Sequence, residues 1–264
     1  MPIKIKDNSR NKHDKRLINI LKTGYFCHDI KIIRTLTNKY YLCITDNHIK
    51  KEISNDVKVI ACDTGVRTFI TTYDEQCVNE IGNDISGKIS KMLNKKDKLQ
   101  KIYKKSIMKL KKNLITKKEH DVNKNKYKLH NEKIQNRVND LHHKAINKLM
   151  EYSLICIPKL NVSQIVQKND IPKISKRILL TQRHSEFIKR LKEKGELCGK
   201  VVKIVDEHLT TKTCSNCFER YEVKSDKIYK CPSCKLIMDR DINAAKNIYI
   251  QQISLLVSSM VQLL

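Results

Sequence analysis

Four cysteines of this sequence form two close pairs. Cys214 and Cys217 make one C-x2-C unit, Cys231 and Cys234 make a second, and 13 residues separate the two units. Each unit aims two thiolates at one point from a short turn, and four thiolates complete a tetrahedral zinc site. Because no position is left open for water or substrate, the spacing predicts one structural Zn²⁺ and not a catalytic one.

Three acidic residues stand at the ends of short elements. Asp63 ends one β-rich run, Glu207 ends another, and Asp241 stands where the last helix is expected to begin. Carboxylates that converge can hold two Mg²⁺ ions, which activate water and stabilise the leaving oxygen in phosphodiester cleavage. Spacing alone does not show convergence, and an isolated acid is more often a turn residue or a helix cap. Asp206 and Glu186 are competing acids for the second position.

The charge of the chain indicates a polyanionic partner. There are 54 Lys and Arg against 28 Asp and Glu, a formal net charge of +26. Nucleic acid is the first candidate and an anionic membrane the second. Residues 91–130 hold 15 lysines and three acids, so the charge is clustered, although coding bias toward lysine or a solvated helix face would also explain it. The expected nucleic-acid contacts are Lys104, Lys105, Lys111, Lys112 and Arg67.

The elements that must position these residues alternate between strands and helices. Short β-rich runs occur at 57–62, 68–73, 76–80, 154–157 and 201–205. Helical spacing predicts an antiparallel basic hairpin over about 88–152, a helix over 177–194 and a last helix from near Asp241. In the first helix of the basic hairpin, the apolar face is expected to consist of Leu99, Tyr103, Ile107, Leu110 and Leu114. A mixed α/β fold follows.

Compartment and membrane contact can also be addressed from the residues. No apolar stretch opens the chain, and the six cysteines outside the two pairs resemble ordinary core residues. We therefore expect an intracellular, reducing compartment. The uncharged segment after Lys246 has helical spacing of apolar residues among Asn, Gln and Ser, which predicts an amphipathic closing helix and not a membrane span. No small-molecule substrate is expected.

The combined motifs resemble a known family. The runs Asp63–Phe69 and Asp239–Ile248, with the two cysteine pairs between them, are similar to the TnpB/Fanzor nucleases, which are transposon-encoded, RNA-guided relatives of the type V CRISPR effectors. The resemblance covers roughly residues 57–250. It implies an RNase H-like (RuvC) mixed sheet with flanking helices, a zinc ribbon inserted before the final helix, and a DNA endonuclease that uses a guide RNA. Asp63 and Asp241 match the first and third catalytic acids.

The second acid departs from the bacterial pattern. The segment 155–162 resembles one in which TnpB carries a glutamate where this sequence has Pro158, and proline has no side-chain metal ligand. The Fanzor branch, found in eukaryotes and viruses, has lost that glutamate and has a replacement on the strand before the zinc ribbon. Glu207 matches the replacement. The resemblance therefore implies the Fanzor branch. It also implies that the protein is located in the nucleus or cytoplasm of a eukaryotic or virus-infected cell.

The domain organisation follows from the same comparison. We expect a remnant of an N-terminal barrel or wedge at 1–56, a nuclease core at 57–209 including the basic hairpin, a zinc ribbon at 210–238, and the final nuclease segment at 239–264. Family members carry more sequence ahead of the core than the 62 residues that precede Asp63 here. Two alternatives therefore stay open: a truncated, inactive nucleic-acid-binding zinc protein, and a DNA transposase.

Overall fold

A computed structural model describes residues 30–43, 57–206, 209–222 and 227–261, with side chains up to residue 258. The chain divides into two compact units, Met1–Ile49 and Lys50–Leu264. In the first unit, β1 (Lys31–Arg34) and β2 (Tyr40–Cys43) form an antiparallel hairpin. All other described elements belong to the second unit, which contains every residue predicted to carry chemistry.

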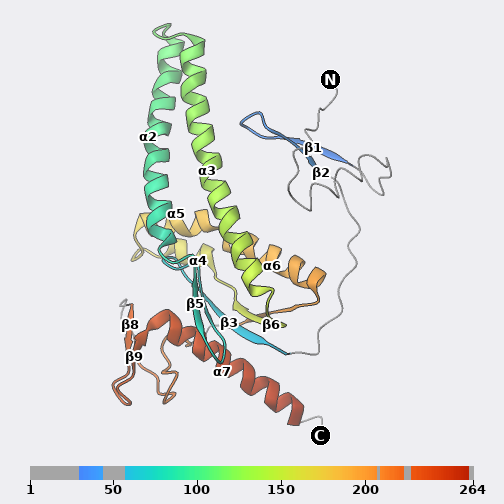
Figure 1. Cartoon of the computed structure of the whole chain (residues 1–264). Helices are drawn as coiled ribbons and strands as arrows, with labels where there is room; N and C mark the ends of the chain where they lie inside the picture. The colour runs from blue at the N-terminus through green and yellow to red at the C-terminus, as the bar shows by residue number, and fades with distance from the viewer. Residues whose placement is uncertain (1–29, 44–56, 207–208, 223–226, 262–264) are drawn as a thin grey trace. The chain divides into compact units, whose positions relative to one another are not determined.

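A five-stranded mixed sheet forms the centre of the second unit (Figure 1). Its strands are β3 (Val59–Thr64), β4 (Ile70–Tyr73), β5 (Val78–Ile81), β6 (Leu154–Pro158) and β7 (Val201–Val205), in the order β5-β4-β3-β6-β7. The pairings β3–β4 and β4–β5 are antiparallel, whereas β3–β6 and β6–β7 are parallel. The predicted mixed α/β fold is confirmed, and each strand lies within two residues of its expected position.

Alternate residues of the central strands face two different cores, as the period of two along a strand requires. Ile60 and Cys62 of β3 pack into the larger core, beneath helices α2, α3, α5 and α6. Ala61 instead packs on the opposite face with Ile248 of α7 (Arg240–Val261). Figure 1 shows α7 alone on its face of the sheet. Asp63, two residues beyond Ala61, therefore points toward the α7 side.

The predicted basic hairpin consists of α2 (Ile85–Lys111) and α3 (Lys117–Leu149). A capping box at Thr116, with Glu119 at the third helical position, starts α3. The sheet-proximal ends pack into the larger core through Ile89 and Val138. The expected apolar face of the first helix is only partly correct, because Leu114 is 68% exposed and lies in the turn after α2 ends.

The helix predicted over 177–194 is two helices. A short helix, α4 (Val162–Gln167), comes first. The helix α5 (Lys173–Gln182) then ends, and α6 (His184–Cys198) begins, at Arg183, whose φ of 53° is left-handed. A continuous helix was wrong because a left-handed residue breaks the i to i−4 hydrogen-bond ladder. The remaining strands, β8 (Ile228–Lys230) and β9 (Ile237–Asp239), are antiparallel. Within the described ranges, no helix is long and apolar enough to cross a membrane.

Candidate metal centres and nucleic-acid surface

The four paired cysteines converge. Their Sγ atoms all lie within 4.8 Å of one another, with 3.6 Å between Cys214 and Cys234 and 3.5 Å between Cys217 and Cys231. Sulfurs around a tetrahedral Zn²⁺ with bonds of about 2.3 Å stand about 3.8 Å apart. The donor set therefore fits a four-thiolate zinc site, and it is the one cluster of three or more such ligands found among the described residues.

The protonation of these thiols also favours a cation. Hydrogen bonds from the Asn216 side chain and the Leu236 backbone lower the pKa of Cys234 to about 6. A hydrogen bond from the Glu219 backbone acts in the same direction on Cys217, but burial and the neighbouring thiols outweigh it and raise the pKa of Cys217 to about 12. Four thiols this close cannot all ionise by themselves, and a divalent cation removes the conflict.

Two buried asparagines of α7 attach the first cysteine turn to the last helix. The Asn243 carboxamide accepts a hydrogen bond from Ser215 N at 2.9 Å and donates one to Thr213 O at 2.7 Å. Asn247 donates to Thr210 O and Thr213 O at 2.8 and 2.7 Å. The cysteine cluster is thereby fixed to the first two turns of the helix that carries Asp241. This role of Asn243 and Asn247 was not predicted, although polar residues four apart on a helix are a signal for it.

Asp63 lies near the carboxyl end of the central strand β3 and is only 8% exposed. Its neighbour two residues back, Ala61, contacts the α7 side of the sheet. The strand pairs with Thr71 on β4 at this position. Asp63 is therefore a carboxylate buried on the covered face of the sheet.

Helix α7 runs antiparallel to β3, which brings Asp241 to the same end of the sheet. Ile253 and Leu256 lie beside Val57 and Val59, at the start of β3. Further along the sheet, the Tyr249 ring meets Tyr73 edge-on at 5.3 Å, and Tyr73 is paired with Ala61. Asp241 precedes Tyr249 by eight residues, about 12 Å of helix, in the direction of Asp63.

The charges around Asp241 are of both signs. Burial raises the pKa of its carboxyl above the ordinary value, and the negative charge of Asp239 raises it further. Arg240, Lys227 and Arg67 oppose these effects. Arg67 belongs to the turn that follows Asp63, and its charge acts on the Asp241 carboxyl, as expected if both acids lie toward one end of the sheet.

Glu207, the predicted second acid, lies outside the described residues. The strand before it ends at Val205, which packs on the α7 side with Ala61 and Ile248. Val205 is paired with Pro158 of β6. Ala61 of β3 is paired with Cys156 of β6 in the parallel register. Two residues further along each strand, Asp63 and Pro158 are therefore level with each other. The position where the resemblance expects a glutamate is therefore beside Asp63, but it carries no ligand.

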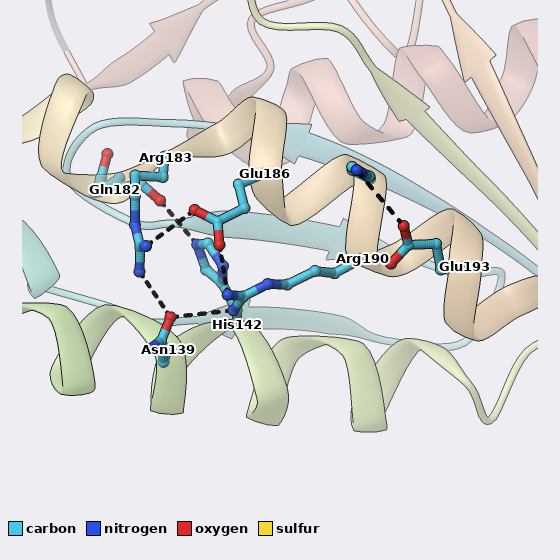
Figure 2. A network of polar contacts seen from close by, with 8 residues as sticks. Asn139, His142, Gln182, Arg183, Glu186, Arg190 and Glu193 are labelled. Carbon is cyan, nitrogen blue, oxygen red and sulfur yellow. Dashed lines mark hydrogen bonds and ion pairs between the residues drawn. The ribbon is translucent and has the colours of Figure 1, made fainter. Parts of the chain in front are cut away.

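The two competing acids differ in their surroundings. Glu186 of α6 forms ion pairs with Arg183 and Arg190, beneath the opposite face of the sheet (Figure 2). It is therefore not a candidate for a site beside α7. Asp206 is exposed and lines an open groove together with Ile250 and Gln251 of α7. Asp206 stays an alternative that experiment must separate from Glu207.

The predicted nucleic-acid contacts are accessible but are not one cluster. Lys104, Lys105, Lys111 and Lys112 are exposed at the far end of α2 from the sheet. Arg67 is exposed in the turn between β3 and β4, and it is the one exposed residue between Ile60 and Ile70. The lysines could follow a phosphate backbone, whereas Arg67 stands at the candidate carboxylate site.

Comparisons with known proteins found similarity over most of the chain. Residues 184–248, from α6 through the cysteine cluster to α7, match the family Cas12f1-like, TNB domain. The chain is 36% identical over 240 residues to TnpB-like protein L770 and 37% identical over 215 residues to TnpB-like protein L79, both of Acanthamoeba polyphaga mimivirus. The chain is therefore similar to TnpB-like proteins over most of its own length. The predicted resemblance is confirmed at that level.

The TnpB-like relatives are much longer than this chain. The two alignments cover 90% and 80% of this chain but only 44% and 41% of the mimivirus proteins. Among solved structures, that described as the cryo-EM structure of the CRISPR-Cas12f ternary complex matches with a TM-score of 0.49 and 21% identity, over 91% of this chain and 49% of that one.

Proposed function

We propose that this chain carries the nuclease centre of a transposon-derived, metal-dependent DNA endonuclease of the RuvC type. The observation that supports it most is that Asp63 of the central strand and Asp241 at the start of α7 lie toward the same end of the sheet, where the two carboxylates could share a metal site. When bound there, two Mg²⁺ ions supply an activated water and stabilise the leaving oxygen.

In this proposal Asp63, Glu207 and Asp241 hold the ions. Glu207 follows Val205 by two residues in the sequence, and Val205 packs on the α7 side of the sheet. Glu207 then supplies the oxygen ligands that Pro158 cannot. This replacement is also what favours the Fanzor branch over bacterial TnpB. The zinc ribbon is structural, and its attachment through Asn243 steadies the helix that presents Asp241.

The partners belong to the same proposal. DNA is the substrate, and a guide RNA is the expected second partner. The net charge of +26 suits both, and the TnpB-like relatives support the assignment. The second candidate is a nucleic-acid-binding zinc protein that does not cut, which the exposed lysines of α2 would support. A DNA transposase is the third.

Cleavage of labelled DNA in Mg²⁺, with RNA that copurifies with the chain, tests the proposal. Glu207→Gln should bind DNA like the wild type but cut it at least about a thousandfold more slowly, because one ligand charge is lost while the shape is kept. Asp206→Asn is the matched control and should cut normally. Normal cutting by Glu207→Gln would refute the assignment. A wild type that binds but never cuts would favour the second candidate.

A further inference from the structure

The turn between β3 and β4 accepts a hydrogen bond from the side chain of Gln182, a residue that belongs neither to the sequence motifs nor to the proposed metal site. Gln182, the last residue of α5, is fully buried and donates a hydrogen bond from Nε2 to Val66 O at 3.0 Å. Val66 immediately precedes Arg67. The contact therefore connects the junction of α5 and α6 to the turn that carries an exposed arginine at the candidate site.

The hydrogen-bond directions in this network are fixed by chemistry. Val66 O can only accept, so the Gln182 amide nitrogen points to it and the amide oxygen is left as an acceptor. His184 Nε2 lies 3.2 Å from that oxygen and must donate to it. His142 Nε2 lies 2.8 Å from Gln182 O and must also donate. Figure 2 shows His142 beneath Gln182. Both histidines therefore carry a hydrogen on Nε2.

The two histidine rings also pack against the end of the turn. Phe69, fully buried, stacks on both His142 and His184, with ring centroids 5.4 and 4.9 Å away. Gly65 N donates to Phe69 O at 3.2 Å, which closes the turn. A Cβ on Gly65 would lie 2.8 Å from Thr68 O, so this position of the turn has no space for a side chain.

The helix junction that presents Gln182 is itself braced. Arg183 adopts the left-handed conformation, which for a residue other than glycine costs roughly 1 kcal/mol or more. Its guanidinium donates to Asn139 Oδ1 at 2.7 Å and pairs with Glu186 at 2.9 Å, and Arg190 contacts the same two partners (Figure 2). This much support for one strained residue indicates that the orientation of Gln182 matters.

We infer that Gln182 is a positioning residue for the nuclease centre, acting through the Val66 carbonyl to hold Arg67 beside Asp63 and Asp241. The inference rests on the proposed function. Arg67 is the one exposed residue from Ile60 to Ile70, so it is the side chain of this turn that can reach the phosphate that is being cut. A guanidinium held in place stabilises charge on a phosphate far better than a mobile one.

The test uses Gln182→Met, which keeps the length of the side chain but has neither polar atom. His130→Ala is the matched control, because His130 is also buried and also bonds a backbone carbonyl, Met92 O at 2.8 Å, away from the turn. We expect Gln182→Met to lower single-turnover cleavage by between about ten- and a hundredfold while DNA affinity changes less than twofold. In an Arg67→Ala background, Gln182→Met should have no further effect.

Amide hydrogen exchange gives a readout that does not need activity. Exchange at 66–69 should become faster in Gln182→Met and stay unchanged in His130→Ala. Two results would overturn the inference: wild-type cleavage by Gln182→Met, or the same loss with and without Arg67, which would mean general destabilisation. If the wild type does not cut at all, the proposed function fails, and unchanged exchange at 66–69 would separately overturn the positioning role.

Discussion

When no cation is bound, the ionised carboxylate of Asp241 destabilises the folded state. Burial and Asp239 raise its pKa, so between its unfolded and folded pKa values the native state binds more protons, and stability falls as pH rises through that window. At neutral pH the full cost is present. Asp241→Asn should therefore raise the melting temperature of the metal-free protein, by about 2–4 °C for each 1 kcal/mol regained.

The same variant should lose cleavage, because a neutral amide is a poorer ligand for divalent cations. Scanning calorimetry in EDTA measures the first effect and the cleavage assay the second. Asp140→Asn is a suitable control, since Asp140 is an exposed acid paired with Lys144 at 3.0 Å. A lower melting temperature for Asp241→Asn would show that its carboxylate is stabilising by itself, against the account given of the site.

Individual residues differ in how far the sequence reveals them. The cysteines and the two aspartates are visible because their types and spacing are unusual. Gln182 is invisible, because a glutamine between helices has no distinguishing pattern and acts only through a carbonyl 116 positions earlier in the chain. Arg183 shows why the helix break was missed: its left-handed conformation is imposed by tertiary contacts and not by residue type.

The zinc ribbon is an element whose folding should depend on its metal. One zinc per chain should be found by elemental analysis, and Cys231→Ser should lose it and unfold the ribbon locally, since binding energy is folding energy in so small a module. Because Asn243 joins the first cysteine turn to α7, amide exchange should also rise at 241–243. Cys156→Ser, a buried thiol outside the cluster, should keep its zinc. Full zinc in Cys231→Ser would contradict the assignment.

The lysines of the α2–α3 hairpin make a salt-dependent prediction. Replacing Lys104, Lys105, Lys111 and Lys112 with Gln should flatten the log–log dependence of DNA affinity on salt by up to about 3 to 4 in slope, if each contacts one phosphate. A control with the same charge change replaces four other exposed lysines: Lys168, Lys173, Lys192 and Lys194. Equal slopes for the two variants would assign the hairpin lysines to a solvated face.

The buried histidine pair ties the stability of the core to pH. Burial lowers the pKa of His142 and of His184 to about 4, and for His184 the neighbouring His142 lowers it further. The unfolded chain then binds more protons between about pH 6.5 and 4, so stability falls as pH falls through this window, by up to about 1.4 kcal/mol per pH unit for each histidine.

Replacing both histidines with Gln keeps a donor at each position and should flatten this part of the pH profile in urea unfolding. His143→Gln, at an exposed neighbouring position, should leave the profile unchanged. A profile for the double variant that parallels the wild type would show that other groups cause the acid sensitivity.

At the scale of the whole molecule, the sequence predicted the mixed sheet, the hairpin and the cysteine cluster, because periodicity and spacing are local signals. It could not predict that α7 runs antiparallel to β3, and this direction is what brings Asp241 toward Asp63. Nor could it identify the asparagine attachment of the ribbon, which depends on two elements meeting. The expected domain boundaries remain predictions beyond the two compact units that the structure defines.

In the proposed site, Asp63, Glu207 and Asp241 share two divalent ions. Mn²⁺ anomalous scattering from a crystal of the zinc-loaded protein would locate these ions. We predict two Mn²⁺ peaks about 4 Å apart, bounded by these three carboxylates, with one peak or both lost in Asp63→Asn. Well-ordered crystals that show no Mn²⁺ beside Asp63, or ions held by Asp206 in place of Glu207, would contradict the account.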